Sequence, residues 1–247
     1  MLEGLQANGQ VFRAATPPEF FCSFMAAVIV QARSAAIDEW YRRLAGPQRC
    51  APWRSLTVWP LSILIPAALE DACSAWRFLR QAGIAAAHIA VGGDSAGGGL
   101  TAALIGRLKA AGEELPGCAW LVSPWVDLTM SGSTVTTKDA VDPLIHRAYL
   151  EELAVAYVPA GMDRMDPTVS PLFGDLRGFP PTLIQVGSAE TLLADASRFA
   201  AAAGAADVSV RLDIWPHMIH AWHLWNARLE AGRRALGSAG EFIRACV

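Results

Sequence analysis

A serine flanked by glycines is the residue of this sequence best suited to do chemistry. Residues 93–97 read Gly-Asp-Ser-Ala-Gly, with an apolar stretch before them and a helix-forming stretch after them. In this context the glycines permit a sharp, strained turn from strand to helix, which lifts the serine hydroxyl above the end of a sheet. The pattern predicts that Ser95 is a nucleophile. The alternative is a glycine-rich turn with an ordinary N-capping serine.

Groups beside Ser95 are candidates for binding the substrate. The helix after the turn directs its N-terminus toward the serine, so the backbone N–H of Ala96 can donate to a developing oxyanion. Asp94 and Gly97 complete the set of candidate oxyanion-hole and substrate-binding residues.

The serine also needs a base, because a hydroxyl is a weak nucleophile. In folds that use this turn, the chain order is serine, acid, histidine. Three histidines, His217, His220 and His223, follow the last predicted strand in the stretch WPHMIHAWHLW. The sequence around His220 is typical of a loop that leads into the closing helix, so His220 is the favoured base, with the other two as alternatives.

The base in turn needs an orienting carboxylate, and the stretch VGSAETLLADASRFA offers Glu190 and Asp195. Glu190 stands at the carboxyl end of a predicted strand, where sites in parallel sheets form. Asp195 lies a turn or so into the helix that follows. Glu190 is therefore favoured, and for either residue the alternative is a solvated carboxylate stabilised by the helix dipole.

The segments that position these residues alternate between strand and helix from residue 66 onward. Strands are predicted at 88–91, 118–122, 182–186 and 208–215, and helices at about 98–111, 191–203 and 227–245. An earlier helix is predicted from the spacing of Leu69, Ala72, Cys73, Trp76 and Leu79, with Gly83 at its C-terminal cap. This alternation predicts an α/β fold, a mostly parallel sheet with helices on both faces. Residues 128–170 form a less regular excursion, and residues 1–65 show no clear period beyond a candidate helix at 35–45.

Composition narrows the class of protein further. The 247 residues are 53% hydrophobic and 17% charged, with a formal net charge of -3, so neither disorder nor nucleic-acid binding is indicated. No apolar stretch approaches the roughly 20 residues of a membrane span, and no secretory signal is visible, so we expect a cytoplasmic protein. Homo-oligomerisation is left open. Five scattered cysteines predict buried thiols rather than a disulfide framework or a zinc site: Cys22, Cys50, Cys73, Cys118 and Cys246.

These residues together resemble the hormone-sensitive-lipase-like family of α/β-hydrolase carboxylesterases. The resemblance covers most of residues 66–245, in the order and near the spacing of that family. The matching stretches are PAALEDACSAWRFL, GDSAGGGL, LVSPWVDLT, DPL, SPLFGDLRGFPPTLIQVGSAETLLADA and MIHAWH.

The resemblance implies one α/β-hydrolase domain over residues 1–247, with residues 128–170 lying over the site. It implies a serine esterase that hydrolyses carboxylic esters of small to medium acyl chains through an acyl-enzyme. Ser95 would be the nucleophile, His220 the base and Glu190 the acid, at a position more often held by aspartate. No metal or organic cofactor is required, and the expected partner is a small ester. Trp125, Trp215 and Trp222 are candidates for lining a pocket, with core packing as the alternative.

Upstream of residue 65 the sequence departs from the family. The family carries a His-Gly-Gly-Gly stretch, which supplies further oxyanion donors, and a Tyr-Arg-Leu-Ala-Pro-Glu-His-Pro stretch; neither is present here. The departure raises a second hypothesis, an impaired or inactive hydrolase-fold protein that binds a ligand or is a gene relic. Peptidase activity through the same three residues is a third.

The genetic code suggests a cause for the departure. Codons for residues 57–64, and others for residues 24–32, can be chosen so that a reading frame displaced in one sense spells both missing motifs. We therefore hypothesise that residues from about 18 to 64 are translated out of frame relative to the family, and that the frame is restored near Ile65.

Overall fold

The computed structural model describes residues 5–7, 10–12, 28–32, 54–58 and 65–247. The candidate helix at 35–45 and most of the segment assigned to a shifted frame lie outside the described residues. The first two strands, β1 (Leu5–Ala7) and β2 (Gln10–Phe12), pair antiparallel in a small sheet of their own.

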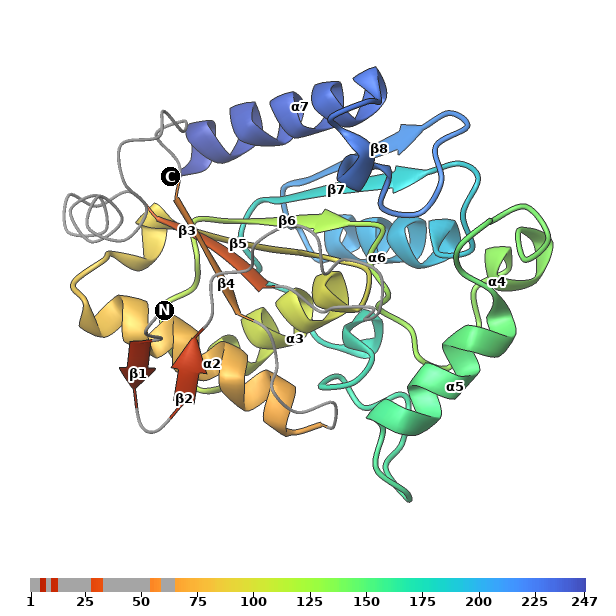
Figure 1. Ribbon diagram of the computed structural model, residues 1–247. Coiled ribbons are helices and arrows are strands. Elements are labelled where there is room, and N and C mark those ends of the chain that lie inside the picture. Colours follow the sequence, from red (N-terminus) through yellow and green to blue (C-terminus); the bar gives the residue numbers. More distant parts are fainter. Residues whose placement is uncertain (1–4, 8–9, 13–27, 33–53, 59–64) are drawn as a thin grey trace.

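The main sheet has the strand order β4-β3-β5-β6-β7-β8 (Figure 1). Its four last strands run parallel to one another, while β3 pairs antiparallel with both β4 and β5. The predicted α/β fold with a mostly parallel sheet is confirmed. The strands are β3 (Val28–Ala32), β4 (Arg54–Val58), β5 (Ile89–Asp94), β6 (Cys118–Val122), β7 (Thr182–Gly187) and β8 (Val210–Trp215).

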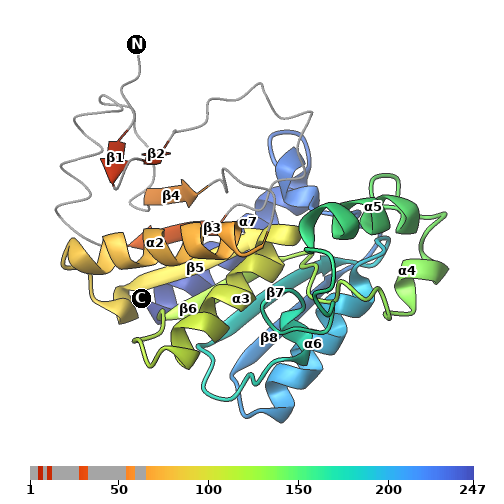
Figure 2. The ribbon, with the colours of Figure 1, turned by 90° about the horizontal axis from the view of Figure 1, so that it is seen from below.

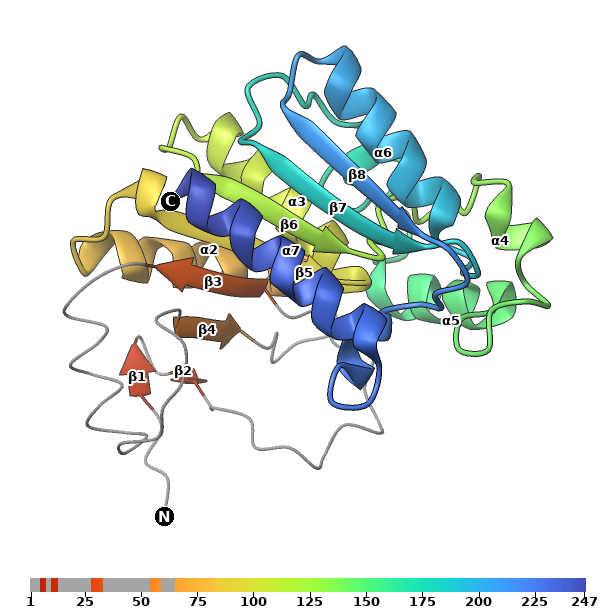
Figure 3. The same ribbon diagram turned by 90° about the horizontal axis from the view of Figure 1, so that it is seen from above.

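Helices cover both faces of this sheet. Three of them, α2 (Ala67–Gln81), α3 (Ala96–Ala110) and α6 (Leu193–Ala205), lie on one face (Figure 2). The closing helix α7 (Glu230–Cys246) crosses the opposite face (Figure 3). Short 3-10 turns precede β5 at Ala86–His88, follow the excursion at Pro171–Phe173 and precede α7 at Trp222–Trp225.

Strand periodicity explains how β7 serves both faces. All six of its residues are buried. Ile184 and Val186 belong to the core beneath α2, α3 and α6, whereas Gln185 points the other way and donates to the backbone carbonyl of Ala235 in α7, at 3.2 Å. Successive side chains of a strand point to opposite faces of the sheet. Because helices cover both faces, nearly every residue of such a strand is buried and the strand sequence is almost continuously hydrophobic.

Helix α2 follows its predicted pattern. The five residues predicted on one face are all buried, and the helix ends just before Gly83, whose φ of +85° is the left-handed conformation of a C-terminal cap. The N–H of Ile84 donates back to the carbonyl of Leu79, at 3.3 Å. The thiols of Cys73 and Cys118 are buried as predicted, but Cys246 is partly exposed because it lies in the last turn of α7.

The excursion at 128–170 has a small core of its own beyond the carboxyl ends of the strands. It carries α4 (Thr134–Thr137) and α5 (Arg147–Tyr157), and its buried residues include Leu128, Ile145 and Leu150. Trp125 and Leu192, from the loops after β6 and β7, belong to the same cluster. The excursion therefore packs against the loops that carry the candidate site.

Candidate active site

Ser95 occupies a strained turn between β5 and α3. Its backbone has φ 56° and ψ −121°, outside the regions that residues other than glycine favour. Backbone hydrogen bonds hold this conformation. The Ser95 N–H donates to the carbonyl of Val122 at 2.9 Å, and the Ser95 carbonyl accepts from Trp125 at 2.9 Å, from Gly98 at 3.0 Å and from Gly99 at 3.3 Å. This is the geometry expected where a turn presents a nucleophile above a sheet.

Glycines in the first turn of α3 allow this helix to lie against the loop after β6. A Cβ added to Gly98 would lie 2.7 Å from the Cβ of Pro124, and one added to Gly99 would lie 2.2 Å from the carbonyl oxygen of Trp125. The contact with the carbonyl involves backbone, which cannot turn aside as a side chain can. The run of glycines after Ser95 therefore reflects close packing as well as the turn itself.

Glu190 follows β7 and is completely buried. Its Oε2 accepts hydrogen bonds from the hydroxyl of Ser123, at 2.9 Å, and from the backbone N–H of Gly187, at 3.0 Å. Its Oε1 lies 3.8 Å from Nδ1 of His220, which is only 3% exposed. The favoured acid and the favoured base are thus brought together, and Nε2 is the imidazole nitrogen that faces away from the carboxylate.

His220 lies in the loop after β8, next to a residue in left-handed conformation. Ala221 has φ 48°, and its N–H donates to the Ser123 hydroxyl oxygen at 3.1 Å. His220 is also close enough to Asp94, at the end of β5, for an electrostatic effect. Burial raises the pKa of the Asp94 carboxyl, and the charge of His220 opposes that rise.

Asp195, the alternative acid, makes different contacts. Its Oδ2 accepts the backbone N–H groups of Val126 and Asp127, both at 3.0 Å. Burial, and then the nearby carboxylate of Asp127, raise the pKa of Asp195 to about 8. Asp127 itself is paired with Arg198 at 2.6 Å. Asp195 therefore organises the loop after β6 in this structure.

The two alternative histidines are also occupied elsewhere. His217 is exposed, and its backbone N–H donates to the Ser188 hydroxyl at 2.8 Å. His223 is buried between the rings of Trp120 and Trp222, and its Nε2 lies 3.0 Å from Oε1 of Gln185. Because that amide oxygen can only accept, Nε2 of His223 carries the proton. Burial lowers the pKa of His223 to about 4, so its ring is neutral at pH 7.

Two residues that the sequence did not single out support the site. Ser123 links Glu190 to the His220 loop through the bonds given above. Asp142, in the Asp-Pro-Leu stretch of the excursion, accepts the N–H of Thr191 at 2.9 Å and so fixes the residue after Glu190. The sequence carried a weak signal for both, since each stands in a stretch that resembles the family.

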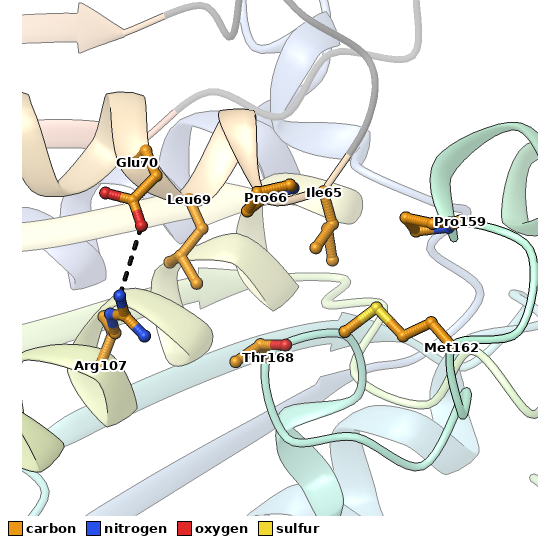
Figure 4. A pocket seen from close by; sticks show the side chains of 8 residues that line it. All are labelled: Ile65, Pro66, Leu69, Glu70, Arg107, Pro159, Met162 and Thr168. Carbon is orange, nitrogen blue, oxygen red and sulfur yellow. Dashed lines mark hydrogen bonds and ion pairs between the residues drawn. The ribbon is translucent and has the colours of Figure 1, made fainter.

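A cavity of about 310 Å³ is lined by other residues (Figure 4). It is bordered by the first turns of α2, by Arg107 of α3 and by the end of the excursion, and an ion pair between Glu70 and Arg107, at 3.4 Å, lies on its wall. Ser95, Glu190 and His220 do not line it. The candidate pocket tryptophans do not line it either: Trp125 and Trp222 are buried in the core, and Trp215 stacks obliquely on Trp222.

Within the described part of the chain, no three His, Cys, Asp or Glu side chains group closely enough to hold a metal ion. No described helix has the length and apolar character needed to cross a membrane.

Comparison with known proteins places this chain in a family. Residues 63–224 match the family described as the alpha/beta hydrolase fold. An acetyl-hydrolase of Streptomyces hygroscopicus is 44% identical over 179 residues, which are 72% of this chain and 60% of the relative. An esterase of Acinetobacter venetianus is 36% identical over 177 residues, covering 72% of this chain and 58% of the relative.

Solved structures agree. An esterase from the bacterial hormone-sensitive lipase family superposes with a TM-score of 0.72 at 39% identity, covering 74% of this chain and 61% of that one. A hormone-sensitive lipase from a metagenome library gives 0.73 at 37% identity, covering 79% and 67%.

The chain belongs to the α/β-hydrolase fold family, and the resemblance to hormone-sensitive-lipase-like esterases is confirmed. It spans about three fifths of the length of the two relatives named above.

Proposed function

We propose that the protein is a serine esterase in which Ser95, His220 and Glu190 form the catalytic triad. The observation that carries the proposal is the Glu190 carboxylate, buried beside Nδ1 of His220 at the carboxyl end of the sheet on which the strained Ser95 turn also stands. The names of the relatives, acetyl-hydrolase and esterase, support the same reaction class.

The proposed reaction is acyl transfer in two halves. His220 takes the proton of the Ser95 hydroxyl through Nε2 as the serine oxygen attacks the ester carbonyl, and Glu190 stabilises the imidazolium that forms. His220 then gives this proton to the leaving alcohol, and the acyl group remains on Ser95. Water, deprotonated by His220, attacks the acyl-enzyme and releases the acid.

The Ala96 N–H, in the first turn of α3, is the proposed oxyanion donor beside the nucleophile. Helix N-termini leave their first N–H groups without partners in the helix, so Ala96 is free to donate to a tetrahedral intermediate if substrate lies there. Asp94 and Gly97 flank this position as proposed substrate-binding residues. We propose carboxylic esters of small to medium acyl chains as the substrates.

Hydrolysis of p-nitrophenyl esters of increasing acyl length tests this proposal. We expect turnover by the wild-type chain, highest with the shorter acyl groups, and a fall to the uncatalysed rate in Ser95→Ala. A folded wild-type chain that hydrolyses none of these esters would favour the second candidate function, an impaired or ligand-binding hydrolase-fold protein.

One observation favours that second candidate: the chain has no His-Gly-Gly-Gly stretch. Loss of one oxyanion donor typically lowers turnover about 100- to 1000-fold. We propose that the cause is a displaced reading frame over residues from about 18 to 64, and the coding DNA tests this directly. Its bases should spell both missing motifs in the displaced frame, and any other outcome rules the explanation out.

A further inference from the structure

We infer that Ser123 is a positioning residue that sets the Glu190 carboxylate and the His220 loop relative to each other. The inference deepens the proposed function and rests on it, because it assigns a role within the proposed triad. In this inference Ser123 neither contacts the substrate nor transfers a proton.

One hydroxyl makes both links. The Ser123 hydroxyl donates its proton to Oε2 of Glu190, at 2.9 Å, and its oxygen accepts the N–H of Ala221, at 3.1 Å. Ala221 directly follows His220 in the chain. A hydroxyl has one proton to donate and two lone pairs to accept, so a single atom can satisfy an acid and a backbone N–H together.

The backbone of Ser123 is itself fixed. The residue is completely buried, with φ 44°, and its N–H donates to the carbonyl of Gln185 in β7, at 2.8 Å. It stands where β6 ends, between the strand that leads to Ser95 and the strand that leads to Glu190. Its side chain is therefore held at a point from which it reaches the loops after β7 and β8.

The contacts that remain without this hydroxyl are few. Oε2 of Glu190 would keep only the N–H of Gly187, and the buried N–H of Ala221 would lose its acceptor. The carboxylate and the imidazole could then drift relative to each other. A displacement of about 1 Å at a catalytic group can lower turnover on the order of 100-fold.

A double-mutant cycle on ester hydrolysis tests the inference. We expect Ser123→Ala to lower kcat about 100-fold with KM changed less than about twofold, because positioning of the triad affects the transition state rather than ground-state binding. In a Glu190→Gln background, assayed at raised enzyme concentration, the same change should lower kcat less than about threefold, because residues acting as a unit are non-additive.

A matched control removes a buried hydroxyl from the opposite end of the neighbouring strand. Thr182 begins β7, at the end away from Glu190, and its hydroxyl donates to the carbonyl of Pro180 at 2.9 Å. Thr182→Val should lower the thermal midpoint but leave kcat within about threefold of wild type. Ser123→Gly serves as a second test variant, since glycine adopts φ 44° without strain and lacks the hydroxyl.

Equal losses of kcat in the wild-type and Glu190→Gln backgrounds would overturn the inference, as would wild-type kcat in Ser123→Ala and Ser123→Gly. If neither variant folds, Ser123 has a structural role and the positioning role is rejected. These outcomes differ from failure of the proposed function, which would appear as a folded wild-type chain without ester hydrolysis.

Discussion

Glu190 and Asp195 offer an instructive comparison, because they lie five residues apart and look alike by simple criteria. Both carboxyl groups are completely buried, and in each one oxygen accepts two hydrogen bonds. Neither second oxygen has a hydrogen-bond partner among the described residues, and the neighbouring group distinguishes them. Oε1 of Glu190 lies 3.8 Å from Nδ1 of His220, whereas the carboxyl group of Asp195 lies near the carboxylate of Asp127, which raises its pKa.

The difference teaches that burial alone does not identify a catalytic carboxyl group. Asp195 is fully buried with a raised pKa, yet it supports the loop after β6. That loop contacts the Ser95 turn through Trp125, whose N–H donates to the Ser95 carbonyl. Glu190 is distinguished by its partner, His220. A buried carboxylate that faces an imidazole can hold the orientation of the ring and stabilise the positive charge of the imidazolium.

Exchange of each carboxyl for its amide should separate the two roles most strongly. We expect Glu190→Gln to lower kcat for ester hydrolysis about 10⁴-fold, because an amide cannot stabilise the imidazolium. Asp195→Asn should keep kcat within about tenfold of wild type, since its amide oxygen can still accept from Val126 and Asp127. The reverse order of effects would exchange the two assignments.

The stability of the fold should depend on Arg198, the cation that pairs with the buried carboxylate of Asp127 and lies near the carboxyl group of Asp195. Asp127 is completely buried, and burial opposes its ionisation, but hydrogen bonds from Ser131, Thr129 and Arg198 together lower its pKa. Arg198→Met would leave this buried carboxylate poorly compensated, and we expect urea unfolding to report a loss of about 3 kcal/mol.

A surface pair provides the control for that measurement. Arg177 is 79% exposed and pairs with Asp175 at 2.8 Å. Arg177→Met should change the free energy of unfolding by less than about 1 kcal/mol. Equal losses in Arg198→Met and Arg177→Met would mean that the buried cluster contributes no more than an exposed ion pair.

Stability as a function of pH should detect Asp195 directly. An unfolded aspartate loses its proton near pH 4, whereas Asp195 in the folded chain keeps it until about pH 8. The folded state binds more protons between these values, so this group lowers wild-type stability as pH rises from 4 to 8. Asp195→Asn has no titrating group at this position, so it should gain stability relative to wild type by up to about 1.4 kcal/mol per pH unit over that range. A stability difference that stays constant with pH would show that Asp195 titrates normally.

Much of the sheet and its helices was predictable because their signals are local. The buried face of α2 and the bounds of β6 follow directly from periodicity and from a short apolar run. Boundaries moved where a turn intervened: His88 closes a 3-10 turn, so β5 begins one residue later than predicted.

The supporting residues were harder to predict because their partners are remote in the chain. Ser123 bonds to residues 67 and 98 positions away, and no spacing in the sequence encodes those contacts. The choice between Glu190 and Asp195 likewise depends on which loop each carboxyl faces. Position relative to the strand end favoured Glu190, but only the packing of the loops reveals what Asp195 does instead.

The histidines give a smaller version of the same comparison. His223 lies three residues after His220, and burial lowers its pKa to about 4, so the folded chain binds fewer protons than the unfolded chain between about pH 4 and pH 6.5. The stability that neutral His223 contributes is complete above pH 6.5 and is lost as pH falls toward 4. His223→Gln, whose amide N–H can still reach Gln185, should not show this loss. Wild type should lose about 2 kcal/mol of unfolding free energy between neutral pH and pH 5 that the variant does not lose, as measured by urea unfolding. An unchanged acid dependence would contradict the neutral assignment.

Covalent labelling with a fluorophosphonate tests most directly whether an activated serine is present. Intact-mass and peptide analysis of the folded wild-type chain should find one adduct, on Ser95, and none in Ser95→Ala. A folded wild-type chain that remains unlabelled, or an adduct that persists when Ser95 is replaced, would contradict the account.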